Sequence, residues 1–342
     1  MSEPVLMLEG TWSEFATAWG IDARTAEMTR LPGGLINDNY LLEEGTQRLV
    51  VRHYRRTTDH ADLVYELSAV EYLSSKGFPT PPLIRSHAKD LFRFVAGRPV
   101  AVFGYLPGKR PESRPGGFGS FDLNLGCQIA AQLARLHRLT WNVALPGKRR
   151  QRGDPLRRVT EFLTRAREWE DVATIAGMSG FLGDLDTVRS ELASAIRSAA
   201  DLPTGLVHAD INETNVLVDD KGRLTALLDF DDCLESHRIY DLCSLITSWG
   251  LDEHRLLDTR RAGRLVATYH RHRPLTYTER SLLPYFLMCY LGASGSEYVT
   301  GLRRRNAFHQ GVTDSFSVTT FRALRDDNRW HDVLRTYVDG KE

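Results

Sequence analysis

The first hundred residues show the alternation of hydrophobic and polar positions that is typical of β strands. Two short β-prone runs, Tyr40–Leu42 and Arg48–Val51, flank a Glu-Gly-Thr turn and predict a hairpin that reverses at the glycine. A second strand pair is predicted at Leu91–Val95 and Val100–Tyr105. Between the two pairs, apolar residues recur at helical spacing over Asp62–Ser75. We therefore expect a small antiparallel sheet with one helix.

Beyond residue 108 the hydrophobic pattern becomes helical. The stretch Lys109–Ser120 is rich in proline, glycine and serine and is expected to be a loop or linker. A β hairpin, Asn215–Val218 with Leu224–Asp229, interrupts the helical pattern. The helices are predicted at 122–139, 156–169, 186–199, 240–249, 262–270 and 278–291. The pattern indicates an α+β chain with two lobes, a small antiparallel β lobe over residues 1–104 and a larger helical lobe over 105–342.

The composition narrows the class of protein. The 342 residues are 42% hydrophobic and 26% charged, which is close to the globular average. No apolar run reaches the roughly 18–20 residues of a membrane helix, and the first residues lack the basic flank and apolar stretch of a signal peptide. Lysine plus arginine equals aspartate plus glutamate at 44 each, so neither nucleic acid nor a membrane is an expected partner. The four cysteines are Cys127, Cys233, Cys243 and Cys289, and they form no CxxC pair. We therefore expect reduced thiols in a cytoplasmic protein.

The segment His208–Asn215 and the hairpin after it carry the strongest chemical signal. Asp210 and Asn215 are five residues apart, and the hairpin ends in Asp229-Phe230-Asp231. Phosphoryl transfer needs one carboxylate to orient the attacking hydroxyl, and a carboxamide and a second carboxylate to hold Mg²⁺ on the phosphates. The hairpin is predicted to bring Asp229 beside Asn215, where two oxygen ligands can share the metal. Aspartate and asparagine in loops are usually turn formers, but this combination of residues, strands and turn favours the functional interpretation.

The stretch LVHADINETNVLVDDKGRLTALLDFDD, followed by IYDLCSLI, resembles the aminoglycoside phosphotransferase and choline kinase family. The resemblance implies the two-lobed fold of protein kinases, with ATP as phosphate donor, GTP as the alternative donor, and Mg²⁺. It implies that Asp210 is the catalytic base and that Asn215 and Asp229 are the metal ligands, with Asp231 as a further candidate. Family members usually have glycine where this chain has Ala209, a small-for-small change that leaves the catalytic residues in place.

The same resemblance implies that the β lobe binds the nucleotide. Arg52 closes a predicted strand where the family has lysine or arginine, and Glu66 lies on the following helix where the family has the pairing glutamate. An arginine there offers the phosphates a planar, two-pronged donor, although a solvated surface charge is the alternative for each residue. A loop over the phosphates is also expected at Gly33, Gly34 and Asn37, although a plain turn explains the two glycines equally well. A backbone site for adenine is expected at Phe103, Gly104 and Tyr105.

Several other residues are expected to have structural roles. Asp241 precedes a predicted helix and is expected to cap or brace the catalytic loop. His208 is expected to fix the backbone of that loop, and His137 to be a packed structural histidine. The basic run over 148–158 is interpreted as a solvated approach to a helix, with binding of an anionic group as the alternative.

The acceptor is expected to be a small molecule. Only eleven residues separate Asp229 from Asp241 and no A-P-E motif follows, which leaves little room for the peptide platform of a protein kinase. Residues 208–260 hold twelve acidic and five basic side chains, a mild bias that favours a neutral, zwitterionic or singly charged acceptor. The pocket is expected between the catalytic loop and the helices over 240–298. Its candidate lining residues are Asp232, Glu235, Trp249, Glu253, Glu297 and Tyr298.

The predicted function is an ATP-dependent O-phosphotransferase that acts on an antibiotic of the aminoglycoside or nucleoside type and confers resistance. The alternative is a metabolic kinase of an amino alcohol, because RPLTYTERSLLPYFLMCYLGA, residues 273–293, is similar to type II homoserine kinases. A non-catalytic pseudokinase is disfavoured because the three residues of the catalytic pattern are all present. A monomer or a homodimer is expected.

Overall fold

A computed structural model describes residues 9–32, 37–55, 59–113, 122–148, 154–170, 174–254, 256–308, 311–312, 315–326 and 330. The chain divides into two compact units. The first comprises Met1–Lys109, Ala144–Arg149 and Thr225–Leu228, and the second comprises Arg110–Val143, Arg150–Leu224 and Asp229–Glu342.

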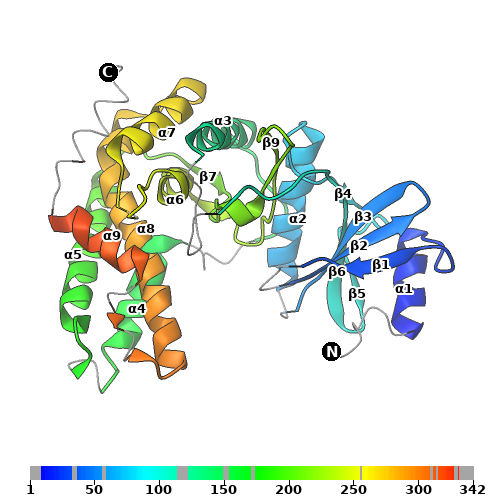
Figure 1. Cartoon of the computed structure of the whole chain (residues 1–342), viewed down its shortest axis with the longest axis horizontal. Helices are drawn as coiled ribbons and strands as arrows, with labels where there is room; N and C mark the ends of the chain where they lie inside the picture. Colours follow the sequence, from blue (N-terminus) through cyan, green and yellow to red (C-terminus); the bar gives the residue numbers. More distant parts are fainter. Residues whose placement is uncertain are drawn as a thin grey trace. The chain divides into compact units, whose positions relative to one another are not determined.

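The first unit is built on an antiparallel sheet (Figure 1). The sheet has the order β1-β2-β3-β6-β4, and β5 pairs with β6. The predicted hairpin is confirmed: β2 and β3 pair along their whole length, and Gly45 turns the chain with a φ of 58°. The strands are β1 (Glu27–Arg30), β2 (Asp38–Glu44), β3 (Gln47–His53), β4 (Leu83–Ile84), β5 (Arg93–Val95) and β6 (Arg98–Gly104).

The first unit also contains two helices where the sequence analysis predicts one. The predicted helix is confirmed as α2 (His60–Ser75), which Asp59 caps by accepting from the N–H of Ala61. The helix α1 (Glu9–Trp19) was not predicted. Phe15 and Trp19 lie one helical turn apart and are buried in the sheet core, so α1 covers a hydrophobic face that the sheet would otherwise expose.

The second unit is largely helical, as predicted. Figure 1 shows the long helix α8 beside α4, α5 and α9. Helix α8 has 28 residues and continues well beyond the predicted residue 291, while α9 was not predicted. The helices are α3 (Leu123–Leu139), α4 (Pro155–Ala166), α5 (Met178–Ser198), α6 (Ile239–Trp249), α7 (Thr259–His272), α8 (Tyr277–Arg304) and α9 (Phe316–Asp326). Among the described residues, no helix has both the length and the apolar character needed to cross a membrane.

Two short strand pairs position the candidate site. The predicted hairpin is confirmed as β8 (Val216–Val218) and β9 (Leu224–Leu227). A second pair, β7 (Thr204–Val207) and β10 (Leu234–His237), was not predicted. Because β7 runs directly into His208 and β10 begins shortly after Asp231, this pairing brings the two chemical segments of the sequence together.

Candidate functional site

The segments 208–215 and 229–231 lie side by side in the second unit. Val207, at the end of β7, is opposite Leu234, at the start of β10. The ring centroids of His208 and Phe230 are 4.5 Å apart. These contacts place Asp229-Phe230-Asp231 next to the start of the predicted catalytic loop, as the chemistry requires.

Two amide side chains orient the carboxylate of Asp210. Nδ2 of Asn215 donates to Oδ2 of Asp210 at 2.7 Å and to its backbone oxygen at 3.0 Å. Nδ2 of Asn212 donates to Oδ1 of Asp210 at 2.9 Å. Oδ1 of Asn212 accepts from the N–H of Thr214 at 2.8 Å, which fixes the orientation of the Asn212 amide. The carboxylate is therefore held in one orientation while Asp210 remains partly exposed.

Asp241 holds the backbone of the loop, and the brace expected from the sequence is confirmed. Its fully buried carboxylate accepts from the N–H of His208 through Oδ2 and from the N–H of Ala209 through Oδ1, both at 2.8 Å. Ala209 has a φ of 69°, a conformation that costs most residues about 1–2 kcal/mol. The brace stabilises this turn, which presents Asp210 beyond it.

A chain of buried hydrogen bonds extends the brace across the second unit. Nε2 of His137 lies 3.0 Å from Oδ2 of Asp241, and Nδ1 lies 2.5 Å from the Tyr269 hydroxyl. Since the Asp241 carboxylate can only accept, His137 donates through Nε2 and accepts from Tyr269 through Nδ1. Arg273 donates to the Tyr269 oxygen at 3.2 Å and to Glu279 at 2.8 Å. The structural role expected for His137 is confirmed.

The charge states of His137 and Asp241 follow from their burial and from their hydrogen-bond partners. Burial lowers the pKa of His137, and the neighbouring Asp241 only partly offsets that effect, so the imidazole is neutral at pH 7. Burial alone would raise the pKa of Asp241, but the hydrogen bonds from His137 and from the loop backbone lower it overall. The carboxylate is therefore ionised and serves the loop as an acceptor.

Serine and tyrosine side chains fix the residue after Asp210. Oγ of Ser244 accepts from the N–H of Ile211 at 3.0 Å, and Oγ of Ser248 donates to the Ile211 oxygen at 2.9 Å. The hydroxyl of Tyr290, on α8, donates to Oγ of Ser244 at 3.0 Å. The loop is thus held on both sides of Asp210.

Asn215 and Asp229 offer oxygen ligands suited to a hard cation. Asn215 immediately precedes β8 and Asp229 follows β9, so the hairpin brings both to the same end. Because Nδ2 of Asn215 faces Asp210, its Oδ1 is turned the other way. Within the described part of the chain, no group of three or more His, Cys, Asp or Glu side chains forms a metal cage. One carboxylate and one amide oxygen, completed by phosphate oxygens, fit Mg²⁺, which proteins rarely enclose on their own.

In the first unit, Arg52 and Glu66 meet as the sequence analysis predicts. Nη1 of Arg52 lies 3.9 Å from Oε1 of Glu66, and the two side chains are 14% and 3% exposed. Nε of Arg52 donates to Oδ1 of Asn39 on the neighbouring strand at 3.1 Å. The Tyr54 hydroxyl donates to Oε1 of Glu66 at 2.7 Å. The guanidinium is therefore held from two sides, by β2 and by α2.

The other residues of the first unit that are predicted to bind the nucleotide differ in their burial and in their contacts. The guanidinium carbon of Arg52 lies 5.6 Å from the ring centroid of the buried Phe103. Gly104 donates its N–H to the oxygen of Pro82 at 2.8 Å, and a Cβ there would lie 2.8 Å from Cγ of Pro82, so this close approach requires glycine. Tyr105 lies under the guanidinium of Arg48 at 4.0 Å, and Asn37 is buried. Gly33 and Gly34 lie outside the described residues.

The residues predicted to line the acceptor pocket differ in their exposure to solvent. Trp249 is fully buried, so its ring belongs to the core and the prediction that it lines a pocket is wrong. Hydrophobic packing accounts for it, since a Cβ on Gly126 would lie 2.9 Å from Cβ of Trp249. Glu297 forms an ion pair with Arg158, a residue of the basic run that was interpreted as a solvated approach to a helix, with binding of an anionic group as the alternative. The remaining candidates are at least partly exposed: Asp232, Glu235, Glu253 and Tyr298.

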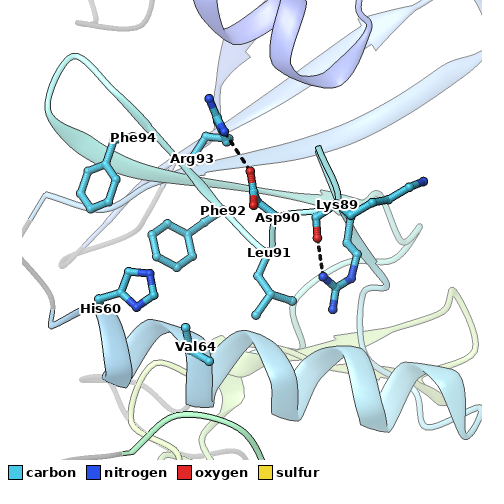
Figure 2. A pocket seen from close by; sticks show the side chains of 9 residues that line it. His60, Val64, Lys89, Asp90, Leu91, Phe92, Arg93 and Phe94 are labelled. Carbon is cyan, nitrogen blue, oxygen red and sulfur yellow. Dashed lines mark hydrogen bonds and ion pairs between the residues drawn. The ribbon is translucent and has the colours of Figure 1, made fainter. Parts of the chain in front are cut away.

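Figure 2 shows a separate pocket in the first unit. His60 and Val64 project from α2 toward Leu91 and Phe92. The pocket has a volume of about 450 Å³, and none of the predicted nucleotide or acceptor residues lines it.

The fold and the loop geometry define a phosphotransferase of the kinase-like type, and comparison with known proteins agrees. The model of the phosphotransferase enzyme family matches residues 27–275. The chain belongs to this family and is a small-molecule phosphotransferase. The two-lobed α+β fold predicted from the sequence is confirmed.

Two homoserine kinases are among the similar sequences. That of Polaromonas naphthalenivorans (strain CJ2) is 30% identical over 261 residues, which are 74% of this chain and 75% of the relative. That of Gluconacetobacter diazotrophicus is 27% identical over 282 residues, 81% of each chain.

Solved structures with the same fold include a microcompartment-associated aminopropanol kinase. It has a TM-score of 0.65 at 18% identity, and the match covers 97% of this chain and 98% of that one. A spectinomycin phosphotransferase in complex with ADP and spectinomycin has a TM-score of 0.61 at 15% identity, covering 98% of this chain and 99% of that one. At these identities the likeness establishes the fold.

Proposed function

We propose that this protein transfers the γ-phosphate of ATP to a hydroxyl group of a small acceptor, with Asp210 as the base. The observation that carries the proposal is the Asp210 carboxylate, which Asn212 and Asn215 orient while the side chain stays partly exposed. Asp210 accepts the hydroxyl proton, the acceptor oxygen forms the new O–P bond, and the bond between the γ-phosphorus and the β-phosphate oxygen breaks to release ADP.

The other site residues have distinct roles in this proposal. Asn215 and Asp229 would hold Mg²⁺, which neutralises negative charge on the phosphates when it is bound. Arg52, held by Asn39 and Glu66, would bind the α- and β-phosphates.

For the acceptor, we propose a small amine-bearing alcohol or hydroxy amino acid. The similar homoserine kinases support this choice, as does the mild acidic bias of residues 208–260. An antibiotic acceptor is the second candidate, supported by the spectinomycin phosphotransferase that shares the fold.

The proposed function is tested by a coupled ADP-release assay over hydroxy amino acids, amino alcohols, aminoglycosides and nucleoside antibiotics. The Asp210→Ala variant provides the blank. Acceptor-dependent ADP release that this variant lacks supports the proposal, whereas no release with any acceptor, together with no binding of Mg·ATP, contradicts it.

The role of Asp229 predicts a specific defect in metal-dependent binding. Replacing Asp229 with alanine removes one charged oxygen ligand, so the affinity for Mg·ATP should fall roughly 10–100-fold. Calorimetry with and without Mg²⁺ measures this, and affinity for ATP alone should be unchanged. An unaltered affinity for Mg·ATP would remove Asp229 from the metal site.

Arg52 and Glu66 are predicted to act as one unit in nucleotide binding. A double-mutant cycle with Arg52→Ala and Glu66→Ala should give a coupling above the roughly 0.2–1 kcal/mol of an exposed ion pair, because both side chains are largely buried. The exposed pair Asp22 and Arg24 is the matched control, with side chains 37% and 88% exposed. Additive effects on nucleotide affinity would show that Glu66 does not position Arg52. Arg52→Lys should retain part of the activity that Arg52→Ala loses.

A further inference from the structure

One face of the C-terminal half of α8 is at least partly exposed, although 14 of the 28 residues of the helix are buried. Tyr290, Ser294, Glu297 and Gly301 are spaced at i, i+4, i+7 and i+11, so they form one stripe along the helix. All four are at least partly exposed, and the residues between Phe286 and Tyr290 are buried. We call this set the α8 stripe. Ser294 is small, which leaves space along the stripe between Tyr290 and Glu297, whereas the guanidinium of Arg305 lies against Gly301, with Nη1 3.2 Å from where a Cβ would be.

The α8 stripe begins at the catalytic loop. The Tyr290 hydroxyl donates to Oγ of Ser244, and this oxygen accepts from the N–H of Ile211, the neighbour of Asp210. Burial raises the pKa of Tyr290, the charge of Asp210 raises it further, and the charge of Arg158 lowers it. The Tyr290 hydroxyl is therefore within electrostatic reach of both the predicted base and a guanidinium.

The α8 stripe leads to an ion pair between helices. Glu297 lies two turns, or about 10 Å, beyond Tyr290, and its side chain leans back toward the N-terminus of the helix. There it pairs with Arg158 of α4, which packs along α8. The side chain of Arg158 is 23% exposed and that of Glu297 is 67% exposed. An ion pair with this much exposure is weak, so a ligand can replace it with two pairs of its own.

We propose that Arg158 and Glu297 recognise the acceptor, and that the acceptor is a zwitterionic hydroxy amino acid. Its carboxylate would bind Arg158, its ammonium group would bind Glu297, and its hydroxyl would reach Asp210. One cation and one anion, side by side, match the two charges of an amino acid. A polycation would instead meet the repulsion of Arg158. This inference rests on the proposed function, because it names the acceptor of the same reaction.

Three related acceptors test the contribution of the carboxylate and of the ammonium group separately. L-Homoserine has both, 3-aminopropan-1-ol lacks the carboxylate, and 4-hydroxybutanoate lacks the ammonium group. Arg158→Gln should lower kcat/KM for L-homoserine about 10–100-fold, the loss expected for one charge-assisted hydrogen bond. The same variant should change kcat/KM for 3-aminopropan-1-ol less than about threefold. Glu297→Gln should show the opposite selectivity, with 4-hydroxybutanoate as the insensitive compound.

The chain offers a matched control on the same helix. Arg157 forms an exposed ion pair with Glu161, and both side chains are 52% exposed. Arg157→Gln should leave kcat/KM unchanged for every acceptor. Arg158→Lys should restore most of the activity on L-homoserine, which separates loss of charge from misfolding. The KM for ATP should stay constant in all these variants.

Several outcomes would overturn the inference without touching the proposed function. In the first, Arg158→Gln lowers kcat/KM equally for acceptors with and without a carboxylate, or changes none of them. In the second, the enzyme phosphorylates amino alcohols or aminoglycosides but not hydroxy amino acids. In the third, the enzyme binds Mg·ATP but phosphorylates no hydroxy amino acid. If neither nucleotide binding nor turnover occurs at all, the proposed function fails first.

Discussion

Replacing Asp210 with alanine should lower kcat by about 10²–10⁴-fold, the range for loss of a general acid–base group. The variant should still bind Mg·ATP, because Asn215 and Asp229 would hold the metal and remain in place. Asn212 and Asn215 donate to the Asp210 carboxylate, and Asn215 also donates to the Asp210 backbone oxygen, a hydrogen bond that the alanine variant can keep. The loop backbone should therefore survive the substitution.

Two comparisons make this result specific. Asp220 is an exposed carboxylate in the turn of the neighbouring β8–β9 hairpin, and Asp220→Ala should turn over at the wild-type rate. Asp210→Asn keeps the size of the side chain and should be nearly as inactive as the alanine variant, since an amide cannot accept the hydroxyl proton. Near-wild-type turnover in either Asp210 variant would exclude it as the base.

The second large effect is expected at Asp241, which touches no substrate. Asp241→Ala should lower the free energy of unfolding of the second unit by about 3–5 kcal/mol. The reason is that two buried donors, on His137 and His208, and one partly buried donor, on Ala209, lose their acceptor at about 1–3 kcal/mol each, partly offset by relaxation. Urea unfolding followed by circular dichroism measures this change. Tyr269→Phe removes two hydrogen bonds of the same network, the one to His137 and the one from Arg273, and should cost about 1–3 kcal/mol.

The effect of Asp241 should also depend on pH in a defined direction. Its pKa in the folded protein is lowered, so its contribution to stability is present above the ordinary pKa of about 3.9 and is lost as the pH falls further. The difference in unfolding free energy between the wild type and Asp241→Ala should therefore be full at pH 7 and shrink below about pH 4. A difference that grows toward acid pH would contradict an ionised Asp241.

The sequence pattern predicts most elements of the fold, and the misses have physical causes. The β2–β3 hairpin and helix α2 carry strong local signals, a turn glycine and a helical repeat. Helix α1 is short, and a short segment with two aromatic residues, Phe15 and Trp19, can be either a helix or a strand. Packing against the sheet stabilises the helix, and this packing is not visible in the local sequence. Helix α8 was predicted too short because its C-terminal half alternates small and polar residues that only the helices around it bury.

The site shows the same division between local and distant signals. Asp210, Asn215 and Asp229 lie within 20 positions of one another, so their spacing could predict their shared chemistry. Asp241 is close enough in sequence to be predicted as the brace of this loop, but the network behind it could not be found in this way, because His137 and Tyr269 are 132 positions apart in the chain. The pairing of Arg158 with Glu297 is likewise a product of the α4–α8 contact. Trp249 shows the opposite error, since an aromatic residue beside acidic ones can equally be part of the core.

The hydrogen-bonded chain from Glu279 to Asp241 has a consequence for the timing of the reaction. The hydrogen bonds that hold the loop around Asp210 come from side chains of the second unit: Asn212, Asn215, Asp241, Ser244 and Ser248, with Tyr290 donating to Ser244. The entropy lost in fixing the loop is therefore lost once, when this unit folds, and not again at each encounter with substrate. The base meets each acceptor already oriented, so the binding energy of the acceptor can go into aligning its hydroxyl with the phosphate instead of into ordering the enzyme.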